Sequence, residues 1–371
     1  MSGHLISVLI GESDATTLSP REWERLLREA HTTMLGARLA EQAIDQGWSD
    51  RIPIRPRRHL EAARIVCASQ QHTMRAEIVR IQRALSAIDA PILLLKGAAY
   101  LMRGLSAAEG RTFSDIDLMV PRDSMQAAES ALLSHGWIAN ASDYDRHYYE
   151  AWMHELPALQ HVQRASVIDL HHTVAPPVSR TPVDARKLFA RARPIADTRF
   201  LVLAPEDMLL HSALHLLQEG QFEHGLRDLF DLDSLFREFG AAPQFWSELV
   251  DRASELGVTR PLYYAVEQTR GLLGTPMPKE FLAAIERIRP PLLTRRLMAS
   301  LLSTSFGDTS GHDASQFVAI ARQLLYLRGH YMRMPLKLLV PHLVRKGGIR
   351  LAAIANGTAA QSIPVGEGTG R

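Results

Sequence analysis

The stretch PILLLKGAAYLMRGL, residues 91–105, decides the fold. Its apolar run at 92–96 has the length of a short buried strand, and Gly97 ends that run. The residues AAYLMRGL that follow are typical of the start of a helix. We therefore expect a strand, a tight turn and a helix here, which together begin an α/β region.

A second strand and a hairpin follow this unit. The segment TFSDIDLMV, residues 112–120, alternates polar and apolar side chains, and Pro121 closes it. Residues 124–135 have a helical pattern. The segments LPALQHV and SVIDLHHTV flank the polar stretch 163–165, which predicts an antiparallel hairpin. Residues 91–174 as a whole therefore predict a mixed α/β region.

Helices are predicted on both sides of this region. From about residue 18 to 85 apolar positions recur at three- and four-residue spacing, with a break at RIPIRPRR, residues 51–58. Two prolines and four arginines predict that this break is an extended, solvated connector, although its arginines could also contact phosphate. After Pro205, short helical segments bounded by Gly or Pro predict a helical bundle.

These patterns predict an α+β fold, in which a small mixed β-sheet core is flanked by helices and both the N-terminal and C-terminal regions are helical. We expect a helical N-terminal region at 1–90, an α/β core at 91–203, a helical C-terminal domain at 204–345 and a flexible tail at 346–371. The tail is small and polar, and such a composition buries too little apolar surface to fold by itself.

The composition is that of an ordinary folded protein. Of 371 residues, 46% are apolar and 22% charged, and 42 Lys and Arg against 40 Asp and Glu give a formal charge of +2. This balance disfavours nucleic acid as a partner without excluding it. The single cysteine, Cys67, excludes a disulfide framework and a thiolate metal cluster. Because there is neither a signal-like N-terminus nor a run of about 18 apolar residues, we expect a cytoplasmic protein with no transmembrane segment.

Asp115 and Asp117 are the most informative residues. On a strand, positions two apart project from one face, so both carboxylates point the same way. Like charges so close together repel unless a cation neutralises them, and hard divalent ions such as Mg²⁺ prefer carboxylate oxygen. An edge strand with two solvated aspartates is the alternative interpretation, because the pattern D-x-D is common.

The surroundings of this pair favour phosphate chemistry. Gly97 stands where a strand turns into a helix, and the first N–H groups of a helix are unpaired and attract phosphate. Lys96 adds a positive charge beside it, and Arg111 could hold a second phosphate oxygen. The alternative for Gly97 is a tight turn with no ligand. The 18-residue spacing from Gly97 to Asp115 is what favours a site.

A third carboxylate, Asp169, lies in the sequence VIDLHH. If this strand lies beside the strand of Asp117, then Val167, Asp169 and His171 share one face and Asp169 joins the pair. A buried unpaired carboxylate is costly, so Asp169 either binds a cation or reaches the edge of the sheet. His171 is an accessory candidate, as a metal ligand, a general base or a histidine whose hydrogen bonds are satisfied locally.

The order of these motifs resembles the family of uncharacterised bacterial nucleotidyltransferases, within the DNA polymerase β-like nucleotidyltransferase superfamily. The motifs are LKGAA, RxxxDIDLMV, IDLHH, PEDMLLHSALH and LRDLFDL, over about residues 91–236. The resemblance implies a small mixed sheet flanked by helices and a two-metal mechanism with Mg²⁺ or Mn²⁺. It also implies transfer of a nucleoside monophosphate from an NTP such as ATP to an acceptor hydroxyl on a small molecule, a peptide or a protein.

The resemblance also assigns residues. It makes the catalytic and metal-binding carboxylates Asp115, Asp117 and Asp169. Gly97 matches the phosphate-loop glycine, and the nucleotide-binding candidates are Lys96, Gly97, Ala98 and Arg111. The superfamily commonly has Gly or Ser after the first glycine, so Ala98 is a departure, for which the charge of Lys96 is the candidate compensation.

A metal-dependent hydrolase is one alternative function. His211 and His215 are four apart on a predicted helix, and Asp228 and Asp231 lie on the next. Histidines at this spacing share a face and could bind Zn²⁺, with the aspartates completing the site. The competing interpretation makes these residues buried polar anchors between helices, with Arg227 as a salt-bridge partner.

Two further interpretations stay open. The chain could be a catalytically silent relative that binds nucleotide or a partner. In addition, the basic segment 322–350 could contact an anionic membrane or nucleic acid, or it could pack as a helix on the bundle.

Overall fold

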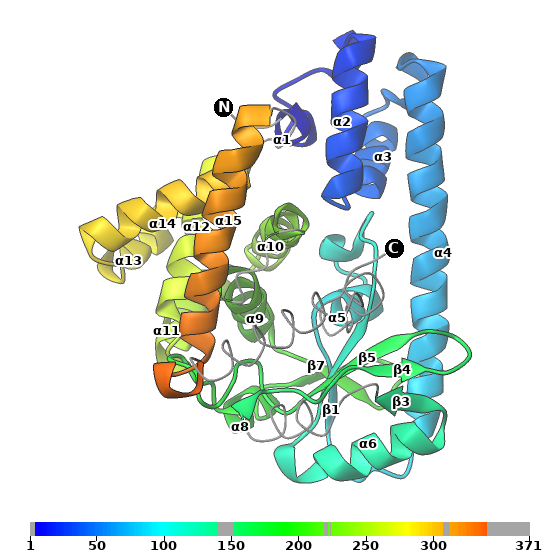
Figure 1. The fold of residues 1–371 in the computed structure, drawn as a ribbon, viewed down its shortest axis with the longest axis vertical. Helices are drawn as coiled ribbons and strands as arrows, with labels where there is room; N and C mark the ends of the chain where they lie inside the picture. The colour runs from blue at the N-terminus through cyan, green and yellow to red at the C-terminus, as the bar shows by residue number, and fades with distance from the viewer. Residues whose placement is uncertain (1–3, 140–151, 219–221, 223, 307–311, 340–371) are drawn as a thin grey trace, which may run out of the picture.

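The computed structural model describes residues 4–139, 152–218, 222, 224–306 and 312–339. Within them, one mixed seven-stranded sheet has the strand order β3-β4-β5-β2-β1-β7-β6, and helices surround it (Figure 1). The strands are β1 (Ile92–Leu94), β2 (Ile116–Met119), β3 (Trp137–Ala139), β4 (Leu159–His161), β5 (Val167–His171), β6 (Arg193–Pro194) and β7 (Phe200–Val202). The predicted α+β class, a mixed sheet flanked by helices, is confirmed.

The centre of the sheet consists of the strands that the sequence predicts. β2 runs antiparallel to β1 and parallel to β5, and β4 and β5 form the predicted antiparallel hairpin. β1 also pairs with β7 in parallel. Residues 92–95 are fully buried, which explains why this stretch is continuously apolar and does not alternate. In contrast, β2 alternates, and it buries Leu118 against the core on one face.

Helices α1 (His4–Leu9), α2 (Pro20–Thr32), α3 (Gly36–Asp45) and α4 (Ile54–Ala84) precede the sheet, with 3-10 turns at Ala15–Thr17 and Ser49–Arg51. Ser19 and Glu22 cap the start of α2 reciprocally, each side chain accepting from the backbone N–H of the other. Met34, with a φ of 60°, separates α2 from α3, because that backbone conformation cannot continue a helix.

The predicted connector at 51–58 is wrong for most of its length. α4 begins at Ile54, with Pro53 as its N-cap and Pro56 in its first turn, where the missing N–H of proline costs no helical hydrogen bond. The prolines therefore begin a helix of 31 residues, whereas the sequence analysis took them as breakers.

Helices α5 (Lys96–Arg103), α6 (Met125–Ser134) and α8 (Ala185–Phe189) and 3-10 turns at Ser106–Ala108 and Arg122–Ser124 lie among the strands. The bundle after the sheet consists of α9 (Pro205–Gln218), α10 (Gly225–Phe239), α11 (Pro243–Glu255), α12 (Thr259–Leu273), α13 (Lys279–Arg287), α14 (Leu292–Ser305) and α15 (His312–Arg333). Figure 1 shows the long helices α4 and α15 on opposite sides of the molecule, with α5 and α9 between them above the sheet.

The described part of the basic segment 322–350 packs on this bundle. Arg322 donates to the carbonyl oxygen of Ser305 at 3.1 Å, and Arg328 donates to that of Leu217 at 2.8 Å. These two arginines are therefore used inside the fold, and contact of the segment with a membrane or nucleic acid stays a prediction.

Two other predictions concern the limits of the chain's regions. All strands of the described residues lie between residues 92 and 202, while the divisions near residues 90 and 203 remain predictions. The predicted tail, 346–371, lies outside the described residues. In the part of the chain that the structure describes, no helix has both the length and the apolar character needed to cross a bilayer.

Candidate active site

The register of β2 and β5 gathers the acidic residues. The two strands are parallel, and across them Asp117 pairs with Asp169 and Met119 with His171. Because paired residues of neighbouring strands project from the same face, Asp169 shares the face of Asp115 and Asp117. Asp117 is 4% exposed, while Asp115 and Asp169 are half-buried at the same side of the sheet.

Asp117 is held by two basic groups. Lys96 Nζ lies 3.0 Å from its Oδ1, and His171 Nε2 lies 3.1 Å from the same oxygen. Burial disfavours the charged carboxylate, but the charge of Lys96 and the hydrogen bond from His171 outweigh it and hold the pKa of Asp117 well below its ordinary value. Although burial opposes it, the pKa of His171 is raised, because His171 is bonded to Asp117 and faces Glu155.

Asp169 has the opposite electrostatic environment. Within the described part of the chain its carboxylate forms no ion pair or side-chain hydrogen bond. Burial, and then the negative charges of Glu155, Asp115 and Asp117, raise the pKa of Asp169 well above its ordinary value. A divalent cation would relieve this crowding, because it would compensate several of the negative charges at once.

The turn between β1 and α5 lies beside these carboxylates. Lys96, its first helical residue, has a φ of 43°, a backbone conformation that is rare for a residue with a side chain. Gly97 has no room for a side chain, because a Cβ would lie 2.4 Å from Arg111 Nη1 and 2.9 Å from the ring of Phe113. The N–H groups at the start of α5, near Gly97 and the buried Ala98, have no helical acceptor and favour an anion.

Arg111 is used inside the fold. Its Nε donates to Asp231 Oδ2 of α10 at 2.7 Å, and Arg38 of α3 donates to the other carboxylate oxygen at 3.3 Å. The guanidinium of Arg111 therefore lies behind Gly97, between the turn and α10. This geometry gives Arg111 a carboxylate partner and suits it to support of the turn, while its predicted contact with a phosphate oxygen stays a prediction.

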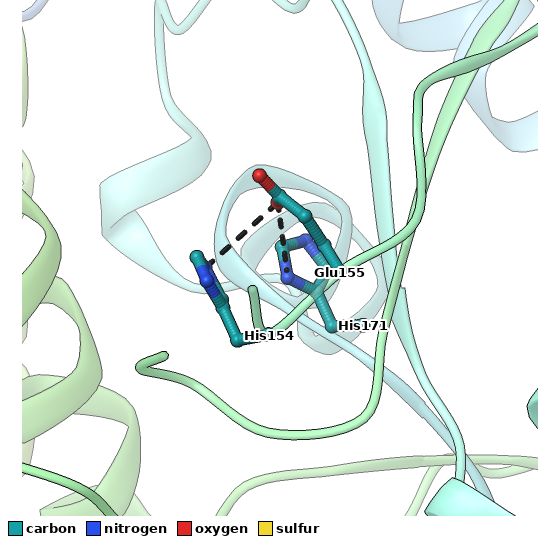
Figure 2. A group of neighbouring side chains, drawn as sticks. All are labelled: His154, Glu155 and His171. Atoms are coloured by element: carbon teal, nitrogen blue, oxygen red, sulfur yellow. Dashed lines mark ion pairs between the residues drawn. The ribbon is translucent and has the colours of Figure 1, made fainter. Parts of the chain in front are cut away.

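A group of side chains next to Asp117 contains the predicted accessory candidate His171 and two residues that the sequence did not reveal, His154 and Glu155. His154, Glu155 and His171 each offer a donor atom, and these atoms lie within 4.8 Å of one another (Figure 2). Glu155 Oε2 is 3.3 Å from His171 Nδ1 and 3.8 Å from His154 Nε2. The available signal was the dipeptide His154-Glu155 shortly before the hairpin, but nothing in its spacing links it to His171.

The residues of the hydrolase alternative are arranged differently. Asp231 binds Arg111 and Arg38, and Arg227 donates to Asp228 Oδ1 at 2.8 Å. Among the described residues, the candidate metal cluster is that of Figure 2, and it includes neither α9 nor α10. The geometry therefore favours the interpretation of these aspartates as buried anchors, and it lends no support to a zinc site there.

The comparison with family models agrees with the motif order. No curated protein matches the chain. The crystal structure of an antigenic nucleotidyltransferase-like protein from Paracoccidioides brasiliensis is similar over 55% of this chain and 93% of that one, at 14% identity and a TM-score of 0.30. Residues 19–274 match the family described as uncharacterised nucleotidyltransferase. Since this match spans more than half of the chain and includes all the gathered carboxylates, the chain belongs to the uncharacterised nucleotidyltransferase family.

Proposed function

We propose that this protein transfers a nucleoside monophosphate from an NTP to a hydroxyl group of an acceptor, which is a small molecule, a peptide or a protein. The observation that carries the proposal is the β2–β5 register, which sets Asp169 opposite Asp117 on one face of the sheet. Family membership supports transferase chemistry, and the carboxylates support the finer assignment of a divalent-cation mechanism.

The donor set fits Mg²⁺ or Mn²⁺. Asp115, Asp117 and Asp169 offer the carboxylate oxygens that these ions prefer, and Asp169 forms no ion pair within the described residues. When bound, the ions would neutralise the triphosphate and lower the pKa of the acceptor hydroxyl.

The protein's own groups hold the nucleotide. Lys96, whose ammonium group lies 3.0 Å from Asp117 Oδ1, carries its charge on a flexible stem and can pass from this carboxylate to a phosphate oxygen. The backbone N–H groups of Gly97 and Ala98 at the start of α5 add hydrogen bonds, and Arg111 keeps this turn in place. Positioning and electrostatics of this kind account for most of the catalysis of phosphoryl transfer.

In the reaction, the acceptor oxygen attacks the α-phosphorus. A new P–O bond forms, the bond from the α-phosphorus to the bridging oxygen breaks, and pyrophosphate leaves. The proton of the hydroxyl goes to Asp169, the carboxylate that forms no ion pair within the described residues.

A labelling experiment tests the proposal. The purified protein is incubated with each NTP labelled at the α-phosphate, with Mg²⁺ and a cell extract, and the labelled product is identified. Asp115→Asn and Asp117→Asn should each reduce labelling by at least about a hundredfold. Asp123 is an exposed aspartate outside the site, so Asp123→Asn should give as much labelled product as the wild type. Circular dichroism checks that each variant is folded.

Two outcomes would contradict the proposal. Labelling that survives in both Asp115→Asn and Asp117→Asn would show that these carboxylates do not hold the ions. Binding of an NTP without any labelled product, across extracts and all four nucleotides, would identify a catalytically silent relative.

A further inference from the structure

We propose that His154, Glu155 and His171 form a second cation site, which takes a borderline divalent ion such as Zn²⁺ and is separate from the aspartates of the proposed Mg²⁺ site. The donor atoms are two imidazole nitrogens and one carboxylate oxygen, gathered within 4.8 Å (Figure 2). Imidazole suits Zn²⁺, whereas Mg²⁺ prefers an all-oxygen environment. The two sites therefore differ in the class of ion that they select.

The distances are close to those that a bound ion needs. With Zn–N and Zn–O distances of about 2.0–2.1 Å, two ligands of a tetrahedral ion lie about 3.3 Å apart. Glu155 Oε2 and His171 Nδ1 are 3.3 Å apart, and Glu155 Oε2 and His154 Nε2 are 3.8 Å apart. The donors of His154 and His171 lie within 4.8 Å of each other, so the two imidazole rings would approach each other when an ion binds.

The orientation of His171 supplies an independent argument. Its Nε2 faces Asp117 Oδ1 at 3.1 Å, so Nδ1 is the nitrogen that is turned toward Glu155. A proton on Nδ1 pairs with the Glu155 carboxylate, and a metal ion that displaces this proton would lie between the same two atoms. A histidine that donates to a carboxylate with one nitrogen and binds a metal with the other is a recurrent arrangement in metalloproteins.

The backbone fixes these residues in place. Glu155 and His171 form an antiparallel bridge, and the adjoining hydrogen bonds run from Leu156 N to Leu170 O at 2.9 Å and from His172 N to the His154 carbonyl at 2.8 Å. Glu155 pairs with His171, and Leu159 pairs with Ile168. Three residues lie between 155 and 159, but only two lie between 168 and 171. This extra residue is a bulge, a device that re-aims side chains along a strand.

Three protein ligands leave the fourth position of a tetrahedral ion open. That position could take water or an oxygen atom of a bound molecule, as in zinc sites that act on substrates.

An ion at this site would also hold the segment of His154 and Glu155 in place, because these two residues would share the ion with His171 of β5. The His154 ring lies 5.3 Å from that of His171, so an ion would join the segment to the middle of the sheet.

Titration of the full-length, untagged and metal-stripped protein tests this inference. Co²⁺ is added as a spectroscopic probe, since its visible absorption reports nitrogen ligands and low coordination number, and Zn²⁺ binding is measured by calorimetry. The wild type should bind one ion, and His154→Ala and Glu155→Gln should each bind it at least about tenfold more weakly. His135→Ala, which removes an exposed histidine, should bind as the wild type does.

Asp169→Asn separates this site from the proposed function. It removes a proposed Mg²⁺ ligand but none of the three donors, so Zn²⁺ and Co²⁺ binding should persist in it. If the transfer reaction fails while this binding persists, only the proposed function falls. The second site falls if the wild type gives no Co²⁺ absorption, if His154→Ala binds Zn²⁺ as tightly as the wild type, or if Asp169→Asn loses Zn²⁺ equally.

Discussion

Two regions of the molecule contain buried or half-buried carboxylates, and they differ in what neutralises the charge. Between the helices, Asp231 has two arginine partners, Arg111 and Arg38, and Asp228 has Arg227. On the face of the sheet, Asp169 has no such partner within the described residues, and its acidic neighbours raise its pKa. Carboxylates matched by arginines hold a fold together. A carboxylate without such a partner, such as Asp169, indicates that a cation from solution binds there and supplies the positive charge.

The largest effect is expected on the matched side. Asp231→Ala would leave Arg111 and Arg38 as largely buried charges without their shared carboxylate, and breaking a buried ion pair in this way costs about 3–5 kcal/mol. Urea unfolding, monitored by circular dichroism, measures the loss. A change below about 1 kcal/mol would mean that this carboxylate is not a structural anchor, and the contrast between the two regions would disappear.

The glycine turn gives the second largest effect. In Gly97→Ala the new methyl group meets Arg111 Nη1 and the Phe113 ring, and the guanidinium cannot move freely because Asp231 holds it. Overpacking of this kind costs about 1–3 kcal/mol. Gly271→Ala, at an exposed position of α12, is the matched control, because nothing lies within 4 Å of the new methyl group and about 0.5–1 kcal/mol should be gained. Equal unfolding free energies for the two variants would show that the turn is not tightly packed.

The third prediction concerns the unmatched side and has the opposite sign. Because the pKa of Asp169 is raised in the folded state, its contribution to stability is complete below the unfolded pKa and is lost as the pH rises through the folded one. Asp169→Asn removes that loss, so at neutral pH in EDTA it should stabilise the protein by about 1 kcal/mol or more. The gain should vanish only as the pH falls to the unfolded pKa of an aspartate, about 4. Destabilisation at neutral pH would indicate a hidden partner of Asp169.

The smallest effect is a proton count. Since Asp169 must be ionised to bind a cation, Mg²⁺ binding should release up to about one proton per protein. Calorimetric titration in two buffers of different ionisation enthalpy measures the release. Asp169→Asn should release fewer protons than the wild type, and an equal release from both proteins would assign the proton to another group.

Features carried by local pattern could be predicted from the sequence. The strands around Asp117 and Asp169, the turn at Gly97 and the hairpin follow from periodicity and from the turn residues. The adjacency of the two acidic strands was only a condition in the sequence, and the structure shows it. The family-level prediction is likewise confirmed by the match over residues 19–274.

What could not be predicted depends on contacts between distant segments. The partner of Arg111 lies 120 residues further along the chain, so the sequence alone suggested a phosphate for it. His154 and Glu155 come close to His171 only because their segment pairs with the end of β5 through a bulge. A bulge interrupts the alternation of a strand, so no periodic pattern in the sequence predicts this pairing. The start of α4 was missed for a local reason, because a proline can begin a helix as well as end one.

The ion triad of Arg38, Asp231 and Arg111 limits how this chain can be divided into fragments or combined into chimeras. It contains one residue from each of the three predicted regions, 1–90, 91–203 and 204–345. A fragment restricted to 91–203 would keep the glycine turn and lose both of the residues that support it from outside. Chimeras between relatives that exchange the helices of the bundle should therefore transfer α10 together with the core, because the turn at Gly97 otherwise loses the support of Asp231.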